Sequence, residues 1–302
     1  MRPLQIRLHV TIFWVKIQFI MEKYCYLNGR IVELKDAKIS ITDLGVLRGY
    51  GVFDFLRTYD GTPFLVDKHL DRLENSAKEA SLKIPISRLE LKKIIYQLIK
   101  KNKAKSVGIR IVVTGGESED GLSCNPEKST LFVLMQKISS PEKSVYEKGV
   151  KLITYNYQRE LAAAKTTNYL TKLKLQGLKK KKNAFEILYV TDDQILEGAT
   201  CNFFVFKGDT LVTPKDNILL GTRRGVVIKL AKKFFKVEER PLKLCELSES
   251  LEAFLTSISK DIVPVTQINE QKIGDGKVGK NTKLLMKVFK EFVEQEKRQQ
   301  SL

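Results

Sequence analysis

Residues 161–170 read LAAAKTTNYL and contain a single charged side chain, Lys165, in a chain with 53 lysines and arginines. Small and uncharged neighbours suit a lysine that is partly buried. Burial disfavours the ammonium form, so the amine becomes nucleophilic near neutral pH, as Schiff-base chemistry requires. The same residues also fit an ordinary solvated lysine, so this interpretation needs support from elsewhere in the chain.

A second candidate is Glu197, in the stretch ILEGATCNFFVF at residues 195–206. A carboxylate at this place can simply end a strand before a glycine turn. It can also lie beside a ring nitrogen and keep that nitrogen protonated. The residues alone leave both interpretations open.

Two further segments can bind an anion. The stretch GTRR at residues 221–224 begins a predicted helix, where free backbone N–H groups attract phosphate and where a hydroxyl and arginines strengthen the site. A basic first turn opposes the helix dipole, and this conflict favours a functional interpretation. Arg72, in KHLDRLENSA at residues 68–77, lies on an amphipathic helix and fits a solvent-facing arginine as well.

Local patterns predict a mixture of strands and helices. Asn28-Gly29 between apolar residues predicts a β-hairpin. We expect Asp67 to cap one helix, and Ser87 with Glu90 to form the capping box of another. Because strands and helices mix without the regular alternation of a doubly wound sheet, we predict an α+β fold.

The same patterns predict two domains. A small N-terminal α/β domain spans residues 21–137, a polar linker spans residues 138–149, and a larger, β-rich C-terminal domain with helices spans residues 150–302. Residues 1–20 are apolar and basic, and Lys16 interrupts them. We expect an extension outside the core or an upstream start site, with a membrane anchor as the alternative.

Composition narrows the class of protein. The four cysteines lie far apart, and the chain has two histidines, so few residues could act as zinc ligands. We therefore expect no metal. We interpret the cysteines as reduced and expect a cytoplasmic protein that does not bind a membrane. The net charge of +18 fits a lysine-rich solvated surface, and the lack of a recognisable module disfavours nucleic acid as a partner. A basic nucleic-acid-binding protein on a degenerate fold is the non-enzyme alternative.

Together, six motifs in order resemble the fold-type IV (class IV) pyridoxal-phosphate-dependent aminotransferases. This family includes branched-chain aminotransferases, D-amino acid aminotransferases and aminodeoxychorismate lyases. The resemblance covers about residues 24–292. The matching segments are the glycine-rich stretch at 43–57, HLDRL at 69–73, Lys165 with NYL at 168–170, EGATCNFF at 197–204, GTRR at 221–224, and TSI at 256–258 with Pro264-Val265 beyond. One match could arise by chance, but six at family-like spacings are specific.

The resemblance implies a role for each matching position. Lys165 would hold pyridoxal 5′-phosphate as a Schiff base and act as the catalytic base. Glu197 would keep the pyridine nitrogen protonated, and Tyr169 would reach the 3-hydroxyl side of the ring. Arg72 would bind the phosphate. It would be joined there by backbone groups of Thr222, Arg223, Ser257 and Ile258.

Two places depart from the family's pattern. The chain has Thr222 then Arg223 where relatives place isoleucine then threonine, and it has Ile258 where many place a threonine. Both changes remove hydroxyl donors to phosphate. We therefore expect altered cofactor affinity, but not loss of binding.

The resemblance also implies reversible transfer of an amino group between an amino acid and a 2-oxo acid such as 2-oxoglutarate. Branched-chain L-amino acids are the first candidates, and Phe53 and Arg110 match pocket positions of those enzymes. Arg48 replaces a tyrosine of those enzymes and could bind a substrate carboxylate, as in some D-amino acid aminotransferases. It could equally lie at a dimer interface, and both can hold, because in the family's homodimer the first-domain loop reaches the neighbouring subunit's site. An aminodeoxychorismate lyase is the third candidate.

Overall fold

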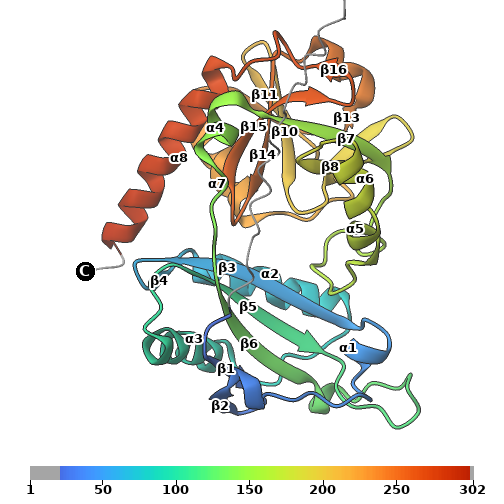
Figure 1. Cartoon of the computed structure of the whole chain (residues 1–302), viewed down its shortest axis with the longest axis vertical. Coiled ribbons are helices and arrows are strands. Elements are labelled where there is room, and N and C mark those ends of the chain that lie inside the picture. The colour runs from blue at the N-terminus through green and yellow to red at the C-terminus, as the bar shows by residue number, and fades with distance from the viewer. Residues whose placement is uncertain (1–20, 300–302) are drawn as a thin grey trace, which may run out of the picture.

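Two β-sheets organise the fold (Figure 1). The computed structural model describes residues 21–299, so the extension predicted at residues 1–20 lies outside the described part of the chain. The strands of the first sheet lie between Tyr24 and Lys137, and those of the second lie between Val150 and Lys272. Within residues 21–299, no helix is both long and apolar enough to cross a membrane.

The first sheet is antiparallel, with the strand order β2-β1-β6-β5-β3-β4. Its strands are β1 (Tyr24–Leu27), β2 (Arg30–Glu33), β3 (Gly51–Tyr59), β4 (Thr62–Pro63), β5 (Val107–Thr114) and β6 (Thr130–Lys137). The predicted hairpin at Asn28-Gly29 is confirmed. Both residues have positive φ, 41° and 90°, as a two-residue turn between twisted strands requires.

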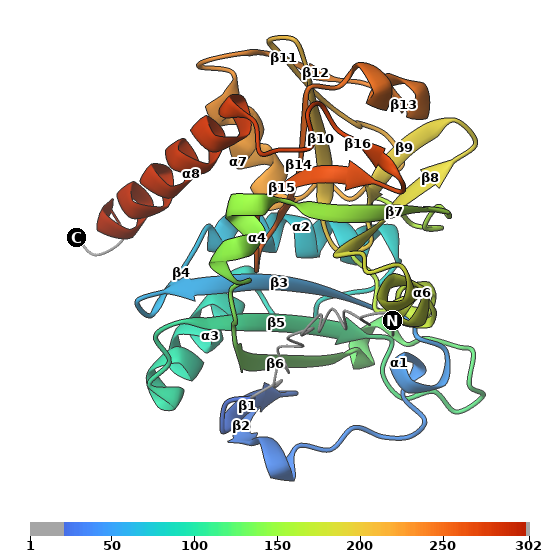
Figure 2. The ribbon, with the colours of Figure 1, turned by 45° about the horizontal axis from the view of Figure 1, so that its top comes forward.

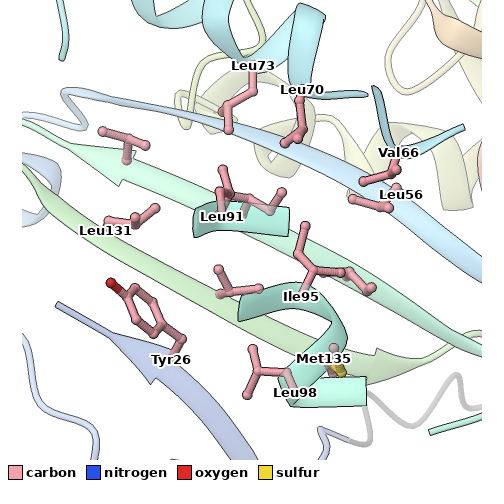
Figure 3. Close-up of a cluster of buried hydrophobic side chains, with 14 of the residues drawn as sticks. Tyr26, Leu56, Val66, Leu70, Leu73, Leu91, Ile95, Leu98, Leu131 and Met135 are labelled. Carbon is pink, nitrogen blue, oxygen red and sulfur yellow. The ribbon is translucent and has the colours of Figure 1, made fainter. Parts of the chain in front are cut away.

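Helices α2 and α3 share one apolar core with this sheet. The helices of this part are α1 (Leu44–Leu47), α2 (Val66–Glu79) and α3 (Arg88–Asn102). Leu70 and Leu73 of α2 and Ile95 and Leu98 of α3 meet apolar side chains of the strands (Figure 3). The predicted capping box at the start of α3 is confirmed.

The start of α2 differs from the expected one. Leu65 precedes the helix in the left-handed conformation, with φ 53°, and no side chain caps the helix. Leu65 packs against a core of the second sheet, so tertiary contacts fix this turn. Asp67, the expected cap, lies inside the first turn and pairs with Lys92 at 3.0 Å.

The second sheet is mixed. Its main path runs β12-β11-β10-β14-β15-β7-β8-β9-β13, and β16 pairs with β15. Its strands are β7 (Val150–Asn156), β8 (Glu186–Thr191), β9 (Gln194–Gly198), β10 (Asn202–Lys207), β11 (Thr210–Thr213), β12 (Lys236–Glu239), β13 (Leu242–Lys243), β14 (Glu252–Ser257), β15 (Asp261–Ile268) and β16 (Gln271–Lys272). Phe204 of β10 and Phe254 of β14 stack with ring centroids 4.8 Å apart, inside a core that α7 and α8 cover.

The helices of this second part lie around the sheet, and α4 lies in the segment expected to be a linker. They are α4 (Lys143–Lys148), α5 (Leu170–Lys174), α6 (Gln176–Lys181), α7 (Thr222–Ala231) and α8 (Lys280–Gln299). Val145 and Tyr146 of α4 pack against the second core, which explains why this polar segment is helical.

Helix α2 lies between the two sheets (Figure 2). One side carries Leu70 and Leu73 into the first core. Ser76 meets the backbone of Lys165, which belongs to the connection after β7. The α+β class predicted from the sequence is confirmed, and α2 is the element that brings the two parts of the candidate site together.

Candidate active site

A cavity of about 970 Å³ lies where the two sheets face each other. All but one of the candidate residues named from the sequence line it. These are Phe53, Arg72, Arg110, Lys165, Tyr169, Glu197, Thr222, Arg223, Ser257 and Ile258. The exception is Arg48. Segments far apart in the sequence thus meet at one site.

Lys165 has its backbone fixed by the first sheet and its amine in the cavity. Its carbonyl accepts a hydrogen bond from the backbone N–H of Phe53 at 2.8 Å, and its own N–H donates to Ser76 Oγ at 3.0 Å. Burial lowers the pKa of its amine to about 7, and the positive charge of Arg72 adds to this effect while Asp54 opposes it. A substantial fraction of the amine is therefore neutral and nucleophilic near neutral pH.

Glu197, near the end of β9, is buried and held by Arg159. Arg159 donates from Nη2 to Glu197 Oε1 at 2.6 Å, and the backbone N–H of Leu219 donates to Oε2 at 3.1 Å. Burial raises the pKa of Glu197, and the guanidinium of Arg159 works against this rise. The pairing favours a carboxylate that can keep a proton on a neighbouring cationic group.

Arg159 also supports the segment that carries the lysine. Its Nη1 donates to the carbonyl of Ala164 at 2.8 Å, and its Nη2 donates to the carbonyl of Ala162 at 2.6 Å. One guanidinium therefore fixes Glu197 and the residues directly before Lys165 relative to each other.

Arg72 is oriented by a buried acid. Asp54 Oδ2 accepts from Arg72 Nε at 2.7 Å, and Asp54 Oδ1 accepts from His69 Nδ1 at 2.6 Å. Burial alone would raise the pKa of Asp54, but Arg72 and His69 outweigh it and hold that pKa well below its usual value. Burial lowers the pKa of His69 to about 4. The pair of Asp54 and Arg72 is thus ionised beside a neutral imidazole.

The start of α7 forms the second half of an anion site. Gly221 is the N-cap and offers no side-chain acceptor, so the first N–H groups of the helix stay available to a ligand. Thr222 Oγ1 lies 3.3 Å from His69 Nε2, which joins this helix to the Arg72 network. Within the described chain, Thr256 Oγ1 and Ser257 Oγ are buried without a hydrogen-bond partner. Buried hydroxyls without partners fit a missing acceptor such as a phosphate group.

The guanidinium groups of Arg223 and Arg224 were expected to strengthen the anion site. In the structure both side chains bind other partners instead. The guanidinium of Arg223 stacks over Phe64 at 4.3 Å and donates to the hydroxyl of Tyr59 at 3.1 Å. Arg224 pairs with Glu239 at 3.0 Å. These partners on neighbouring elements draw both side chains away, so the backbone carries the anion binding at this helix.

Aromatic rings with stacked cations form the wall beside Lys165. The ring of Phe53 lies 4.6 Å from Lys165 Nζ and 5.6 Å from the ring of Tyr169. Arg110 stacks over Phe53 at 4.8 Å and over Phe55 at 5.3 Å. Among residues 21–299, no acid lies within 4.0 Å of the Arg110 guanidinium. The wall therefore offers apolar surface and, at Arg110, a positive charge without a counter-ion among the described residues.

Arg48 lies outside the cavity of its own chain. It is exposed, and its Nε donates to the carbonyl of Gly121 at 3.1 Å. This contact ties Arg48 to the loop between β5 and β6.

Three residues of the site were not assigned a role from the sequence. Asp54 and His69 lie inside motifs that were recognised, but the network that joins them to Arg72 depends on contacts between β3 and α2. Arg159 and Glu160 end the polar stretch directly before the uncharged lysine segment. That change of composition was the one local signal for it.

A family model, Amino-transferase class IV, matches residues 51–268. The match covers more than half of the chain, and this chain belongs to the class IV aminotransferases. The resemblance inferred from the motifs and the prediction of an aminotransferase are thereby confirmed. Enzymes of this class use pyridoxal phosphate.

Two curated relatives are similar over most of their length. A putative branched-chain-amino-acid aminotransferase of Methanocaldococcus jannaschii is 36% identical over 280 residues, which cover 88% of this chain and 95% of that protein. A D-alanine aminotransferase of Bacillus licheniformis is 31% identical over 264 residues, which cover 85% and 92%. Relatives of both predicted substrate groups are thus similar to the chain.

Solved structures agree on the fold. The branched-chain amino acid aminotransferase of Escherichia coli has a TM-score of 0.83 at 26% identity, over 89% of this chain and 93% of that one. The T.th. branched-chain amino acid aminotransferase, solved with pyridoxamine 5′-phosphate, has a TM-score of 0.82 at 24% identity, over 90% and 94%.

Proposed function

We propose that this enzyme transfers an amino group between a branched-chain L-amino acid and a 2-oxo acid such as 2-oxoglutarate, with pyridoxal 5′-phosphate bound at Lys165. One observation carries the proposal. A single cavity joins an amine of lowered pKa, a buried carboxylate paired with an arginine, and an anion site with buried hydroxyls that have no partner.

The residues present fit this cofactor. Arg72, the N–H groups at the start of α7, and the hydroxyls of Thr256 and Ser257 would hold its phosphate. Glu197 would hold a proton on the pyridine nitrogen, and Tyr169 would lie on the side of the ring hydroxyl. When bound, the cofactor supplies an aldehyde that a primary amine attacks and a ring that withdraws electrons from the substrate Cα.

The chain's own groups then perform the proton transfers. The neutral amine of Lys165 can remove the proton from the substrate Cα, because its pKa of about 7 leaves a large neutral fraction at neutral pH. Glu197, whose carboxylate pairs with Arg159, would hold the proton at the ring nitrogen. Phe53 and Tyr169 cover the amine with apolar surface, which limits the access of water.

Apolar side chains next to Lys165 support branched-chain substrates. Phe53, Phe55 and Tyr169 line the cavity and suit an aliphatic side chain. Arg110 suits a carboxylate, since its charge has no acid partner within the described chain. The relative from Methanocaldococcus jannaschii, which bears a branched-chain name, favours the same assignment.

D-Amino acids are the second candidate substrates. The relative from Bacillus licheniformis is a D-alanine aminotransferase, and Arg48 offers a guanidinium for a substrate carboxylate. An aminodeoxychorismate lyase remains the third candidate, because it would share the same cofactor groups.

We also propose a homodimer in which Arg48 approaches the partner's cavity. Large apolar side chains beside Arg48 in the chain are open to solvent: Val46 is 61% exposed and Leu47 is 41% exposed. Leu122, next to the Gly121 that Arg48 contacts, is 75% exposed. An exposed apolar patch of this kind is typical of an interface between subunits.

We also propose a cytoplasmic location. The four cysteines are free, which agrees with a reducing compartment.

A substrate panel tests these proposals. Purified enzyme with bound cofactor is mixed with single L- and D-amino acids, and the change in visible absorbance reports the half-reaction. We expect L-leucine, L-isoleucine and L-valine to react fastest. Faster reaction with D-alanine would favour the second candidate, and no reaction with any amino acid would contradict the proposed function. Arg48→Ala in the same panel shows whether that arginine selects the substrate.

A further inference from the structure

The backbone of Lys165 is bound to the first sheet and its helix, although the segment belongs to the second part of the chain. Besides the bond from Phe53 N–H to the Lys165 carbonyl, the N–H of Thr167 donates to the carbonyl of Gly51 at 2.9 Å. The segment thus pairs with the edge of β3. The remaining polar group of the Lys165 backbone, its N–H, leaves this pairing and donates to Ser76 of α2 at 3.0 Å.

Ser76 is fully buried, and its hydroxyl makes two bonds at once. It donates its proton to the carbonyl of Arg72, four residues earlier in α2, at 2.8 Å. Its oxygen accepts from the Lys165 N–H. The bond to the Arg72 carbonyl does not explain why a serine stands here, because serine in a helix interior slightly destabilises the helix. The second bond gives the partly buried N–H of Lys165 its acceptor.

Arg72 and Ser76 therefore mark two points on one rigid helix. Residues four apart lie on the same face and are separated by about 6 Å along the axis. Arg72 belongs to the anion site, and Ser76 holds the residue that would bind the aldehyde. A cofactor with its phosphate at one point and its aldehyde near the other must match this spacing.

We propose that Ser76 is a positioning residue, which sets the distance between the phosphate site at Arg72 and the amine of Lys165. The inference rests on the proposed function, because it assumes that one ligand occupies both points. Removal of the hydroxyl leaves the partly buried N–H of Lys165 without its protein acceptor, so the segment shifts. The phosphate then no longer delivers the aldehyde to the amine at the right distance.

Two aldehydes test this inference. Pyridoxal 5′-phosphate can engage both points, whereas pyridoxal lacks the phosphate and can engage Lys165 alone. The full-length protein, freed of cofactor, is mixed with each aldehyde, and visible absorbance gives the rate of capture. For Ser76→Ala we expect about a tenfold loss in the preference for pyridoxal 5′-phosphate over pyridoxal. Leaving one backbone donor without its acceptor changes an equilibrium constant by about this factor.

Ser250→Ala is the matched control. Ser250 is also buried, and its hydroxyl donates to the carbonyl of Glu246, four residues earlier, at 2.8 Å. Within the described chain its oxygen accepts no second bond, and it does not line the cavity. This variant loses the same kind of serine-to-carbonyl bond and should keep the wild-type preference between the two aldehydes.

The outcomes separate the inference from the proposed function. An unchanged preference in Ser76→Ala, or an equal loss for both aldehydes, would overturn the positioning role. A wild type that captures neither aldehyde would overturn the proposed function instead. If Ser76→Ala does not fold, Ser76→Cys keeps the volume with a weak sulfur acceptor, and the same loss of preference is expected.

Discussion

The guanidinium of Arg159 lies 2.6 Å from the carboxylate of Glu197 and, through two further bonds, holds the carbonyls of Ala162 and Ala164. The acid expected at the ring nitrogen and the loop that carries Lys165 are therefore fixed by one side chain. Burial without this cation would favour the protonated acid, which cannot stabilise a proton on the ring.

Arg159→Met should lower kcat by about 10²-fold at pH 7, as expected when a buried charge pair loses one partner. Because the pKa of Glu197 is already raised by burial, loss of Arg159 should raise it further. The acidic limb of the pH profile of kcat should move to higher pH. Arg240→Met is the control, since Arg240 pairs with Glu246 at 2.8 Å outside the cavity. An unchanged acidic limb in Arg159→Met would refute the role of this pair.

The rate at which cofactor-free protein captures pyridoxal 5′-phosphate should depend on pH through Lys165. Since burial lowers the pKa of its amine to about 7, the rate should rise as pH increases through about 7 and then level off. Stopped-flow absorbance measures this rate. A rate that keeps rising up to about pH 10, the ordinary range for lysine, would show that the amine is not desolvated.

Asp54→Asn should destabilise the protein by about 3 kcal/mol, because Arg72 then loses its buried counter-ion. Urea unfolding at pH 7 measures this change. The control is Asp67→Asn, which affects an acid with a 59% exposed side chain that pairs with Lys92. That variant should lose less than about 1 kcal/mol. Equal losses in the two variants would contradict the importance of the buried network.

Acid should weaken the fold through the same network. His69 has a folded pKa of about 4 against an ordinary 6.5, so the unfolded chain binds the proton first as pH falls. Stability should therefore begin to fall below about pH 6.5 and should fall further once Asp54, whose pKa is lowered, must be protonated. In Asp54→Asn the further fall below about pH 4 should disappear. The fall between about pH 6.5 and pH 4 should remain, because Asp54 raises the pKa of His69 and its loss lowers that pKa further. A free energy of unfolding that is constant from pH 7 to about pH 4 would contradict this account.

Gly108 leaves room for the aromatic wall of the cavity. A Cβ atom at Gly108 would overlap Cζ of Phe55, which lies across the β3–β5 pairing. Gly108→Ala should push this ring toward the substrate and raise KM for branched-chain substrates about tenfold, with Phe55→Leu in the same chain restoring it. Gly177→Ala, where a Cβ meets nothing within 4 Å, should leave KM unchanged. If the double variant has the same KM as Gly108→Ala, the steric explanation fails.

The sequence predicted those parts of the molecule that depend on neighbours in the chain. Asn28-Gly29 and the capping box of Ser87 and Glu90 form as expected, because their geometry is local. Asp67 was a wrong cap because Leu65, fixed by packing against the other part of the chain, begins the helix earlier. The helix inside residues 138–149 was missed for a similar reason, since its apolar face appears once the second sheet is present.

The site shows the same division. Lys165, Glu197 and Arg72 stand in recognisable segments, and the structure brings them to one cavity. Their supports come from far along the chain: Asp54 reaches Arg72 across 18 positions, and Ser76 reaches Lys165 across 89. No local pattern in the sequence specifies such contacts. The chemical groups of the site could therefore be predicted from the sequence, whereas their orientation depends on the folded structure.

The most direct test of the account is to trap the cofactor on the chain. Wild-type protein reconstituted with pyridoxal 5′-phosphate is reduced with borohydride, digested, and searched by mass spectrometry for the pyridoxyl group. We predict a single modified side chain, Lys165, and no stable modification in Lys165→Ala. A pyridoxyl group on another lysine, or none on the wild type, would contradict the claim that this amine binds the cofactor.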